Sequence, residues 1–374
     1  MRPSRALIDL DALRHNIRLL NSIAKNARCA AVIKADAYGH GAVEIARALK
    51  GEAPKLAVAC YDEAVSLREA GITTPLLVLE GFYSSEELAD STRWRDIEWV
   101  VHDMEQLDML SEVAPLRKAG PNSARMQTWI KLNTGMNRLG LPLNKLAGVA
   151  EMLRQFPGLS VIGLMTHFAC ADELDSLLQQ KQWRAFQAGM QVAGSGGWSY
   201  SSANSAALLQ YPETHLDWVR PGIAMYGASP MADKTGADFG LKPVMSFESR
   251  LIATRELQAG DSIGYGAAWT ANGPTRMGVV AVGYGDGYPR QMRNGAPVAV
   301  CGKRTSVIGR VSMDMLTVDI SHIPEARIGS EVELWGGAVS ADEVAGYAST
   351  ISYTLFTGMT SRVPRVYLNR SEGV

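Results

Sequence analysis

The sequence predicts an α/β domain, a (β/α)8 barrel of the TIM type, followed by a mostly β C-terminal domain. Short β-rich apolar runs alternate with amphipathic helical patterns from Arg5 to about Gly227, and repeated strand–helix units are typical of a parallel sheet. Eight or nine strand candidates in roughly 220 residues favour a closed barrel over an open doubly wound sheet of about six strands. Beyond this region the apolar runs are short, alternating and separated by glycine, which indicates antiparallel strands.

The strand candidates of the first domain follow one another between helical patterns. One of them is surplus to an eight-stranded barrel, and the first is expected to lie outside it. The candidates are ALIDL, CAAVIKA, KLAVAC, PLLVLEG, IEWVVH, MQTWIKLN, LSVIGLMTHF, WSYSSAN and WVRPGIAMYG. Helical patterns, most with apolar residues at i, i+3, i+4 and i+7, cover residues 11–24, 41–50, 62–70, 143–156 and 177–190.

A change of rhythm near residues 230–240 predicts the domain boundary. The segment PMADKTGADFG has the charge, glycine and proline content of a linker. We expect the barrel over residues 11–232 and the β domain over residues 233–374, with residues 1–10 as a candidate extra strand of the β domain. One helical stretch is expected there, near residues 342–350. The expected strands lie in MSFESRLIATREL, DSIGYG, MGVVAVGYG, APVAVCG, RTSVIGRVSMDMLTVDI and SEVELWG.

The composition is that of an ordinary globular protein with small-molecule partners. The 374 residues are 47% hydrophobic, and 37 basic against 38 acidic residues give a formal charge of −1, without the basic stripe that nucleic acids require. The four cysteines form no CxxC pair and no His cluster has metal-ligand spacing, so neither a disulfide framework nor a metal site is expected. No signal peptide or run of membrane length is recognised, so we expect a cytoplasmic protein without membrane contact.

Lys34 is the first candidate for chemistry. It ends the apolar run AAVIK, and a barrel strand delivers its last residues to the face at which such folds place their active sites. Burial among Ala31, Val32, Ile33 and Ala35 is expected to desolvate the ammonium and favour the neutral amine, which suits a lysine that attacks an aldehyde. On local pattern alone, the commoner alternative is a strand-end lysine that extends to solvent.

Three short segments could bind a phosphate. In DAYGHG, Tyr38 could donate to a phosphate, and the two glycines are expected to let the backbone approach a ligand closely. In VRPGIAMYG, Arg220 ends the last barrel strand and the following Gly222 and Ile223 offer backbone N–H groups, at a place where barrels commonly bind phosphate. In SSANS, Ser205 offers a hydroxyl. Ordinary alternatives remain open, a surface salt bridge for Arg220 and a helix N-cap for Ser205.

Seven motifs together resemble bacterial alanine racemases, a family of fold-type III pyridoxal-phosphate enzymes. The resemblance spans essentially the whole chain, and the first motif is highly specific for the family. The resemblance implies an isomerase that uses pyridoxal 5'-phosphate to interconvert L-alanine and D-alanine, either to supply D-alanine to the cell wall or to catabolise it. The motifs, in chain order, are AVIKADAYGHG, KLNTGMNRLG, THFA, DWVRPGIAMYG, GYG, GYGDGYPR and GRVSMDM.

The resemblance implies two bases on opposite faces of the substrate. Lys34 matches the lysine that anchors the cofactor and serves the D-enantiomer, and Tyr265 in GYG matches the base for the other enantiomer. His167 of THFA and Arg220 match a chain of groups that lowers the free energy needed to ionise the tyrosine. Arg220 also matches the residue that faces the pyridine nitrogen of the cofactor, and its fixed positive charge is expected to keep that nitrogen unprotonated.

The remaining matches concern the cofactor phosphate and the substrate carboxylate. Arg138 matches the arginine near the carboxylate, and the backbone N–H of Met313 matches a second carboxylate contact. Lys131 aligns with a lysine that is carbamylated in many family members and then positions the arginine. The implied partners of the phosphate are Tyr38, Ser205, Gly222 and Ile223.

The resemblance also implies a homodimer with shared active sites. Tyr265, Met313 and Asp314 match residues of the β domain that complete the site of the other subunit. Tyr284 in GYGDGYPR matches a residue at the substrate entrance, although a packed strand tyrosine is an equal alternative.

Three positions depart from the commonest family pattern. Ser361 stands directly before RVPR, where some relatives carry a phosphate-binding tyrosine, and we therefore leave it out of the site. Asn133 and Asn137, in KLNTGMNRLG, also differ from the commonest residues. The alternatives that remain are a serine or broad-specificity racemase on the same scaffold, a pyridoxal-phosphate decarboxylase and a non-catalytic cofactor-carrying protein. Arg220 argues against the decarboxylase, because such enzymes pair the ring nitrogen with an acid.

Overall fold

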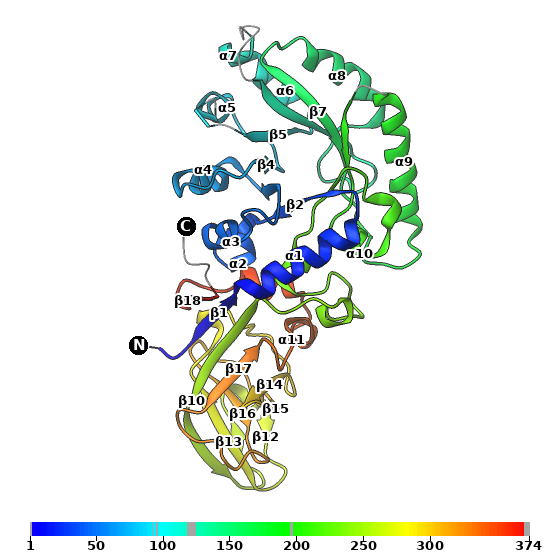
Figure 1. Ribbon diagram of the computed structural model, residues 1–374. Helices are drawn as coiled ribbons and strands as arrows, with labels where there is room; N and C mark the ends of the chain where they lie inside the picture. Colours follow the sequence, from blue (N-terminus) through cyan, green and yellow to red (C-terminus); the bar gives the residue numbers. More distant parts are fainter. Residues whose placement is uncertain (1, 92, 95, 118–124, 195–196, 370–374) are drawn as a thin grey trace.

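Eight parallel strands form the first of the two large sheets (Figure 1) of this computed structural model, which describes residues 2–91, 93–94, 96–117, 125–194 and 197–369. Their order is β8-β7-β6-β5-β4-β3-β2-β9. The strands are β2 (Arg28–Val32), β3 (Lys55–Val58), β4 (Leu76–Val78), β5 (Ile97–Val101), β6 (Met126–Lys131), β7 (Leu159–Met165), β8 (Ser199–Ser201) and β9 (Trp218–Val219).

The sheet closes on itself between β8 and β9. Asn204 and Arg220, which follow these two strands, form a parallel bridge, and the backbone N–H of Arg220 donates to the Ala203 carbonyl at 2.8 Å. The expected barrel is therefore confirmed, with helices around it. These helices are α1 (Leu10–Ala24), α3 (Ala42–Ala48), α4 (Tyr61–Glu69), α5 (Ser85–Ser91), α6 (Glu105–Glu112), α7 (Ala114–Arg117), α8 (Leu146–Arg154), α9 (Leu177–Ala193) and α10 (Ser205–Gln210).

The first helix shows how the sequence pattern becomes structure. Asp9 caps α1, because its carboxylate accepts the N–H groups of Asp11 and Ala12 at 2.9 and 3.1 Å. The apolar residues repeat with helical spacing and face the core, whereas most of the polar positions between them are at least partly exposed; Asn16 is the buried exception. The buried apolar side chains are Leu10, Ala12, Leu13, Ile17, Leu20 and Ala24.

The second sheet is mostly antiparallel. Its order is β15-β14-β17-β10-β1-β18, and β13 pairs with both β10 and β16. β1 (Arg5–Asp9) lies between β10 and β18 in this sheet, and its pairing with β18 is parallel. The other strands are β10 (Met245–Leu257), β13 (Thr275–Val280), β14 (Pro297–Val300), β15 (Lys303–Ser306), β16 (Leu316–Asp319), β17 (Glu331–Trp335) and β18 (Arg365–Leu368), with the hairpin of β11 (Ser262–Ile263) and β12 (Trp269–Thr270).

The expectation of a single helical stretch in the β domain is wrong. Besides α11 (Ala341–Tyr347) there is a second helix, α12 (Ser352–Thr357). Its sequence, SYTLFT, is rich in residues that favour strands, so local propensity argues against a helix. Burial of Leu355 and Phe356 decides the conformation instead.

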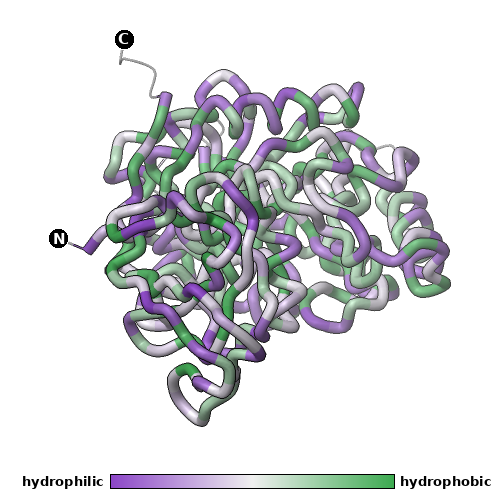
Figure 2. The backbone as a smooth tube through the Cα atoms, turned by 90° about the horizontal axis from the view of Figure 1, so that it is seen from below, coloured by the Kyte–Doolittle hydropathy of each residue, from purple (hydrophilic) through white to green (hydrophobic). Residues whose placement is uncertain are grey.

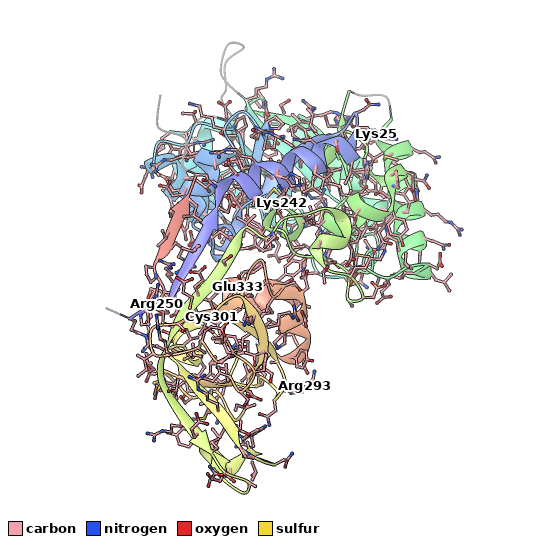
Figure 3. All side chains as sticks on the ribbon, turned by 60° about the horizontal axis from the view of Figure 1, so that its bottom comes forward. Lys25, Lys242, Arg250, Arg293, Cys301 and Glu333 are labelled. Carbon is pink, nitrogen blue, oxygen red and sulfur yellow. The ribbon has the colours of Figure 1, made fainter. Side chains whose placement is uncertain are left out.

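The segment expected to be a linker is ordered and held from both sides. It contains a 3-10 helix, η4 (Gly236–Phe239), with a capping box. Just beyond it, the amide of the buried Asn16 side chain on α1 donates to the Lys242 carbonyl at 2.7 Å and accepts the Lys242 N–H at 2.8 Å. Figure 3 shows Lys242 beside α1. On the other side, the Asp342 carboxylate accepts the N–H groups of Ser229 and Gly236.

Polar and apolar stretches alternate along the described parts of the chain (Figure 2). Within the described residues, no helix combines the length and the apolar character that crossing a membrane requires.

Candidate active site

A single pocket gathers every barrel residue that the sequence placed in the site. It has a volume of about 430 Å³, which suits a small ligand. It lies where the barrel strands end at their carboxyl termini, the usual place for chemistry in this fold. The residues expected from the sequence that line it are Lys34, Tyr38, Lys131, Arg138, His167, Ser205, Arg220, Gly222 and Ile223.

Lys34 is held by strand pairing that continues past the end of β2. The N–H of Val32 donates to the Pro221 carbonyl at 2.9 Å, and the N–H of Ile33 donates to the Ala57 carbonyl at 2.8 Å. Lys34 itself is half-buried and Ala35 is exposed. The expectation that Ala35 helps to bury the lysine is therefore wrong in the single chain, because the backbone changes direction directly after Lys34.

That change of direction is a left-handed turn. Lys34 begins α2 (Lys34–Gly39), in which Ala35, Asp36, Ala37 and Tyr38 all have φ of 52–53°. These torsions lie in the left-handed region, which L-residues seldom occupy. Side-chain acceptors stabilise the turn: Glu63 accepts the N–H of Ala35 at 2.6 Å, and Asp36 accepts the N–H of Ala42 at 2.7 Å.

The two glycines of DAYGHG serve a different purpose from the one expected. A Cβ on Gly39 would lie 2.2 Å from the Phe356 carbonyl oxygen, and a Cβ on Gly41 would lie 1.8 Å from the hydroxyl of Tyr367. Both contacts are made by the C-terminal part of the chain. The expectation that these glycines approach a ligand is therefore wrong, because they admit α12 and β18 against the turn that carries Lys34.

Ser205, Gly222 and Tyr38 form one end of the pocket. The Ser205 hydroxyl accepts the N–H of Gly222 at 2.8 Å and that of Ala224 at 3.4 Å. A Cβ on Gly222 would lie 2.3 Å from the Tyr38 hydroxyl, so only glycine allows the tyrosine this position. Ser205 begins α10 and Ile223 begins the 3-10 helix η3 (Ile223–Tyr226), and helix starts carry N–H groups suited to an anion. Two hydroxyls and backbone N–H groups thus converge at this end.

Arg220 supplies a fixed positive charge. Its guanidinium is buried and donates to the Ser201 hydroxyl and to the carbonyls of Thr166 and Ser202. All three acceptors are neutral, so none of them cancels the charge. Burial lowers the pKa of Arg220 to about 10, which still leaves it protonated near neutral pH.

Lys131 and His167 both respond to this charge. Burial, followed by the positive charges of Arg220, Arg138 and Lys34, lowers the pKa of Lys131 to about 8. Burial and then the charge of Arg220 also lower the pKa of His167 well below its usual range, so its ring is neutral. A lysine that readily loses its proton and a neutral imidazole therefore stand in an electropositive pocket.

Arg138 projects from a loop that the two unusual asparagines organise. The Asn133 side chain accepts the N–H groups of Gly135 and Asn137 at 3.0 and 3.1 Å, and it donates to the Asn137 side chain at 2.9 Å. Asn137 has φ of 56°, a conformation that asparagine tolerates better than most residues. Arg138 follows directly and is exposed. Ser361, the third unusual residue, is also exposed and does not line the pocket.

The site residues expected from the β domain lie outside this pocket. Tyr265 is in the 3-10 turn η5 (Tyr265–Ala267), between β11 and β12, and is 74% exposed. Met313 is 53% exposed and Tyr284 is 37% exposed. These three residues and Asp314, all within the described part of the chain, are not among the lining residues of the pocket. In Figure 1, β12 lies in the half of the molecule away from the barrel.

Sequence reasoning missed several lining residues. Tyr353 and Thr357 reach the pocket from α12, and Tyr353 packs against Tyr38 with ring centroids 5.8 Å apart. Glu80 and Asn204 follow the ends of β4 and β8 and also line it. Strand-end position was a usable signal for Glu80 and Asn204, whereas Tyr353 depended on a helix that the sequence did not predict. In the described ranges, no group of three or more His, Cys, Asp or Glu side chains could hold a metal ion.

Comparison with known proteins gives consistent matches over the chain. The family model for the alanine racemase N-terminal domain matches residues 8–230, and that for the C-terminal domain matches residues 244–367. An alanine racemase of Hahella chejuensis is 94% identical over 374 residues, all of both chains. A catabolic alanine racemase of Pseudomonas putida is 49% identical over 98% of this chain and 99% of its own. The crystal structure of the biosynthetic alanine racemase of Pseudomonas aeruginosa has a TM-score of 0.92 and 43% identity, covering 99% of this chain and all of the other.

Proposed function

The chain belongs to the alanine racemase family and interconverts L-alanine and D-alanine, and we propose that it uses pyridoxal 5'-phosphate on Lys34, with Lys34 and Tyr265 as opposed bases. Membership of this family, whose enzymes depend on pyridoxal phosphate, places the protein among isomerases rather than decarboxylases or cofactor carriers. The roles of individual residues, as cofactor anchor and as bases, are the proposed part.

The observation that carries the proposal is the content of the barrel pocket. Lys34 lines a cavity of about 430 Å³ that Tyr38, Ser205, Gly222 and Ile223 also line, and these four residues are the proposed partners of the phosphate. Arg220 faces the same cavity with a charge that its three neutral acceptors do not cancel. A primary amine, an anion-binding end and a cation for the ring nitrogen are the three partners that the cofactor needs, so the residues fit it.

When bound, the cofactor withdraws electrons from the substrate and so acidifies its Cα–H bond. Racemisation then requires one group on each face of Cα, because a single base mostly returns the proton to the face from which it came. In the direction from D-alanine to L-alanine, Lys34 removes the Cα proton and the Tyr265 hydroxyl delivers a proton to the opposite face. In the direction from L-alanine to D-alanine, the Tyr265 phenolate removes the Cα proton and the Lys34 ammonium delivers one.

Tyr265 reaches the substrate from a partner subunit in this proposal. Within one chain the tyrosine is 74% exposed and stands outside the pocket that Lys34 lines. An exposed tyrosine with a role at the substrate requires a second chain to bring the two together. We therefore propose a homodimer in which each active site joins the barrel of one chain to the β domain of the other.

The electropositive pocket favours the chemistry of Tyr265. A phenol loses its proton readily only near pH 10 in water, so its ionised form must be stabilised. Arg220 supplies a fixed charge, and the neutral ring of His167 can accept or donate a hydrogen bond between the arginine and the phenol. We therefore propose a hydrogen-bonded chain that runs from Tyr265 through His167 to Arg220.

The substrate carboxylate is assigned to Arg138, which lines the pocket. Arg138 is exposed to the cavity and suited to a carboxylate, and the backbone N–H of the partner subunit's Met313 is the proposed second contact. Lys131, with its pKa of about 8, has the reactive neutral amine that carbamylation requires. A carbamate there would place an anion among Arg138, Arg220 and Lys34, where the surrounding charge favours it. Asp314 and Tyr284 of each chain are proposed to support the carboxylate-binding edge of the active site that the chain's β domain completes in its partner.

Two measurements test the proposal. Chiral chromatography over a panel of amino acids should find alanine processed fastest; comparable rates with serine, lysine or arginine would instead indicate a broad-specificity enzyme. Borohydride reduction should fix the cofactor to the peptide that contains Lys34, as read by mass spectrometry. The adduct should be lost in Lys34→Ala and retained in Lys50→Ala, a matched change of an exposed lysine. An adduct that persists without Lys34 would overturn the anchor assignment.

A further inference from the structure

Four charged residues of alternating sign form a network in the β domain. Arg2 donates to the Asp286 carboxylate at 2.7 Å, and the Nε of Arg362 lies 3.4 Å from the other oxygen of that carboxylate. Arg362 also donates to the Asp314 carboxylate at 2.7 Å. Arg2 donates to the Asp314 backbone carbonyl at 3.0 Å, which closes the network. The network thus joins the N-terminal segment, two loops and the segment before β18.

Asp286 anchors the network in the interior. Its side chain is 0% exposed, and it also accepts the N–H of Gly283 at 3.0 Å. A buried carboxylate is costly unless cations and N–H groups satisfy it. Arg2 and Arg362 are its two cations: Arg2 hydrogen-bonds Oδ2, whereas Oδ1 has no hydrogen-bond partner among the described residues and depends on the charge of Arg362 at 3.4 Å.

The network directly supports two loops that carry proposed site residues. Tyr284 donates its N–H to the Ser312 carbonyl at 3.1 Å, and Gly285 donates to the Met313 carbonyl at 2.9 Å, so the two loops are paired. A Cβ on Gly285 would lie 2.3 Å from Nη1 of Arg362, which shows how closely the guanidinium lies against the loop. Hydrogen bonding by Arg362 also lowers the pKa of Asp314 and keeps it ionised.

Exposed loops need such support. Met313 is 53% exposed and Met315 is 43% exposed, so apolar packing within the chain restrains this loop little. Loops with few buried contacts open easily unless other bonds hold them. The four charges supply those bonds, and the buried Asp286 ties them to the interior of the domain.

We propose that Arg362, together with Arg2 and Asp286, positions the Met313 and Tyr284 loops for the active site of the partner subunit. This inference rests on the proposed composite site and adds three positioning residues that never touch the substrate. Arg362 acts through Asp314 and Gly285, so its loss displaces the backbone N–H that would meet the substrate carboxylate.

The test uses heterodimers with one working site. Pairing a Lys34→Ala chain with a Tyr265→Ala chain leaves one intact site, made of the barrel of the second chain and the β domain of the first. Arg362→Gln is then added to either chain. In the Lys34→Ala chain it lies in the working β domain, and in the Tyr265→Ala chain it lies in the idle one.

Arg362→Gln should impair activity only in the first placement. There the KM for alanine should rise about tenfold or more, with a smaller fall in kcat, because the carboxylate contact is misplaced. The second placement should match the parent heterodimer, and Arg362→Lys should restore part of the loss. Hydrogen exchange of residues 312–315 in the Arg362→Gln homodimer should be faster, a readout independent of activity.

The control is Arg250→Gln, which removes an exposed ion pair with Glu331 elsewhere in the same domain (Figure 3). Equal losses from both placements, or unchanged exchange and KM in the first, would overturn the inference alone. A verified parent heterodimer without activity would overturn the composite site, and the inference with it. The two failures are therefore distinguishable.

Discussion

Tyr265 and Lys34, the two proposed bases, do not share a cavity within one chain. Lys34 lines the barrel pocket, whereas Tyr265 stands 74% exposed on the turn between β11 and β12. This separation shapes the predictions for Tyr265.

Tyr265→Phe should slow proton removal from L-alanine far more than from D-alanine. The variant keeps the ring and loses the group that would take the proton, so loss of a general base should cost roughly 100-fold or more on one face. Exchange of the Cα proton in deuterated water, followed by NMR for each enantiomer, measures this. Tyr347→Phe, a change at another partly exposed tyrosine, is the control. Equal slowing for both enantiomers would contradict the division of labour.

Lys131 should carry a carbamate under bicarbonate. Its pKa of about 8 means that the neutral amine becomes more abundant as pH rises through 8, so carbamylation should be faster at pH 8.5 than at pH 7. With labelled bicarbonate, 13C NMR should show one carbamate signal that disappears in Lys131→Ala. That variant should lose about tenfold in kcat/KM, because Arg138 loses its anionic partner. Retention of the signal in Lys131→Ala would assign the carbamate to another amine.

The buried His40 should make the fold sensitive to mild acid. Burial lowers the pKa of His40 to about 4 from its ordinary 6.5, so the folded ring stays neutral while the unfolded chain takes up a proton. The contribution of the neutral His40 ring to the free energy of unfolding is therefore fully present above about pH 6.5. About 3 kcal/mol of it is lost as pH falls towards 4. Urea unfolding of wild type and His40→Phe over this range should show the difference, since other groups titrate in both. His322→Gln, at an exposed position, should keep the wild-type profile.

In a buried ion pair of the barrel, the carboxylate of Glu98 should stabilise the fold by neutralising the Lys55 ammonium. Lys55 and Glu98 lie 2.6 Å apart, Trp129 donates to the same carboxylate at 2.7 Å, and the Trp218 ring centroid is 3.8 Å from the ammonium. Glu98→Gln leaves the ammonium buried without an anion, which should cost about 3 kcal/mol of unfolding free energy. Glu151→Gln breaks an exposed pair with Arg154 and should cost less than about 0.5 kcal/mol. Similar costs for both changes would show that the buried charge is hydrated.

The barrel and part of its pocket followed from patterns that the sequence shows directly, whereas Lys131, Arg138 and His167 followed from the family resemblance. Strand–helix alternation located the eight strands, and strand-end position located Lys34, Arg220 and Ser205. These predictions succeeded because periodicity and strand ends are local properties of the chain.

Features that depend on distant contacts could not be predicted in this way. Gly39 and Gly41 are explained only by Phe356 and Tyr367, more than 300 residues away in the chain. The helix that carries Tyr353 contradicts its own local propensity and forms through burial. The network around Asp286 joins Arg2 to residues near position 362, a pairing that no motif spacing reveals.

The left-handed turn after Lys34 has a stereochemical consequence. Four successive L-residues, Ala35 to Tyr38, adopt torsions that are natural for D-residues, at a cost of about 1 kcal/mol or more each. Chemical synthesis of the chain with D-alanine at position 35 or 37 would therefore relieve strain rather than introduce it.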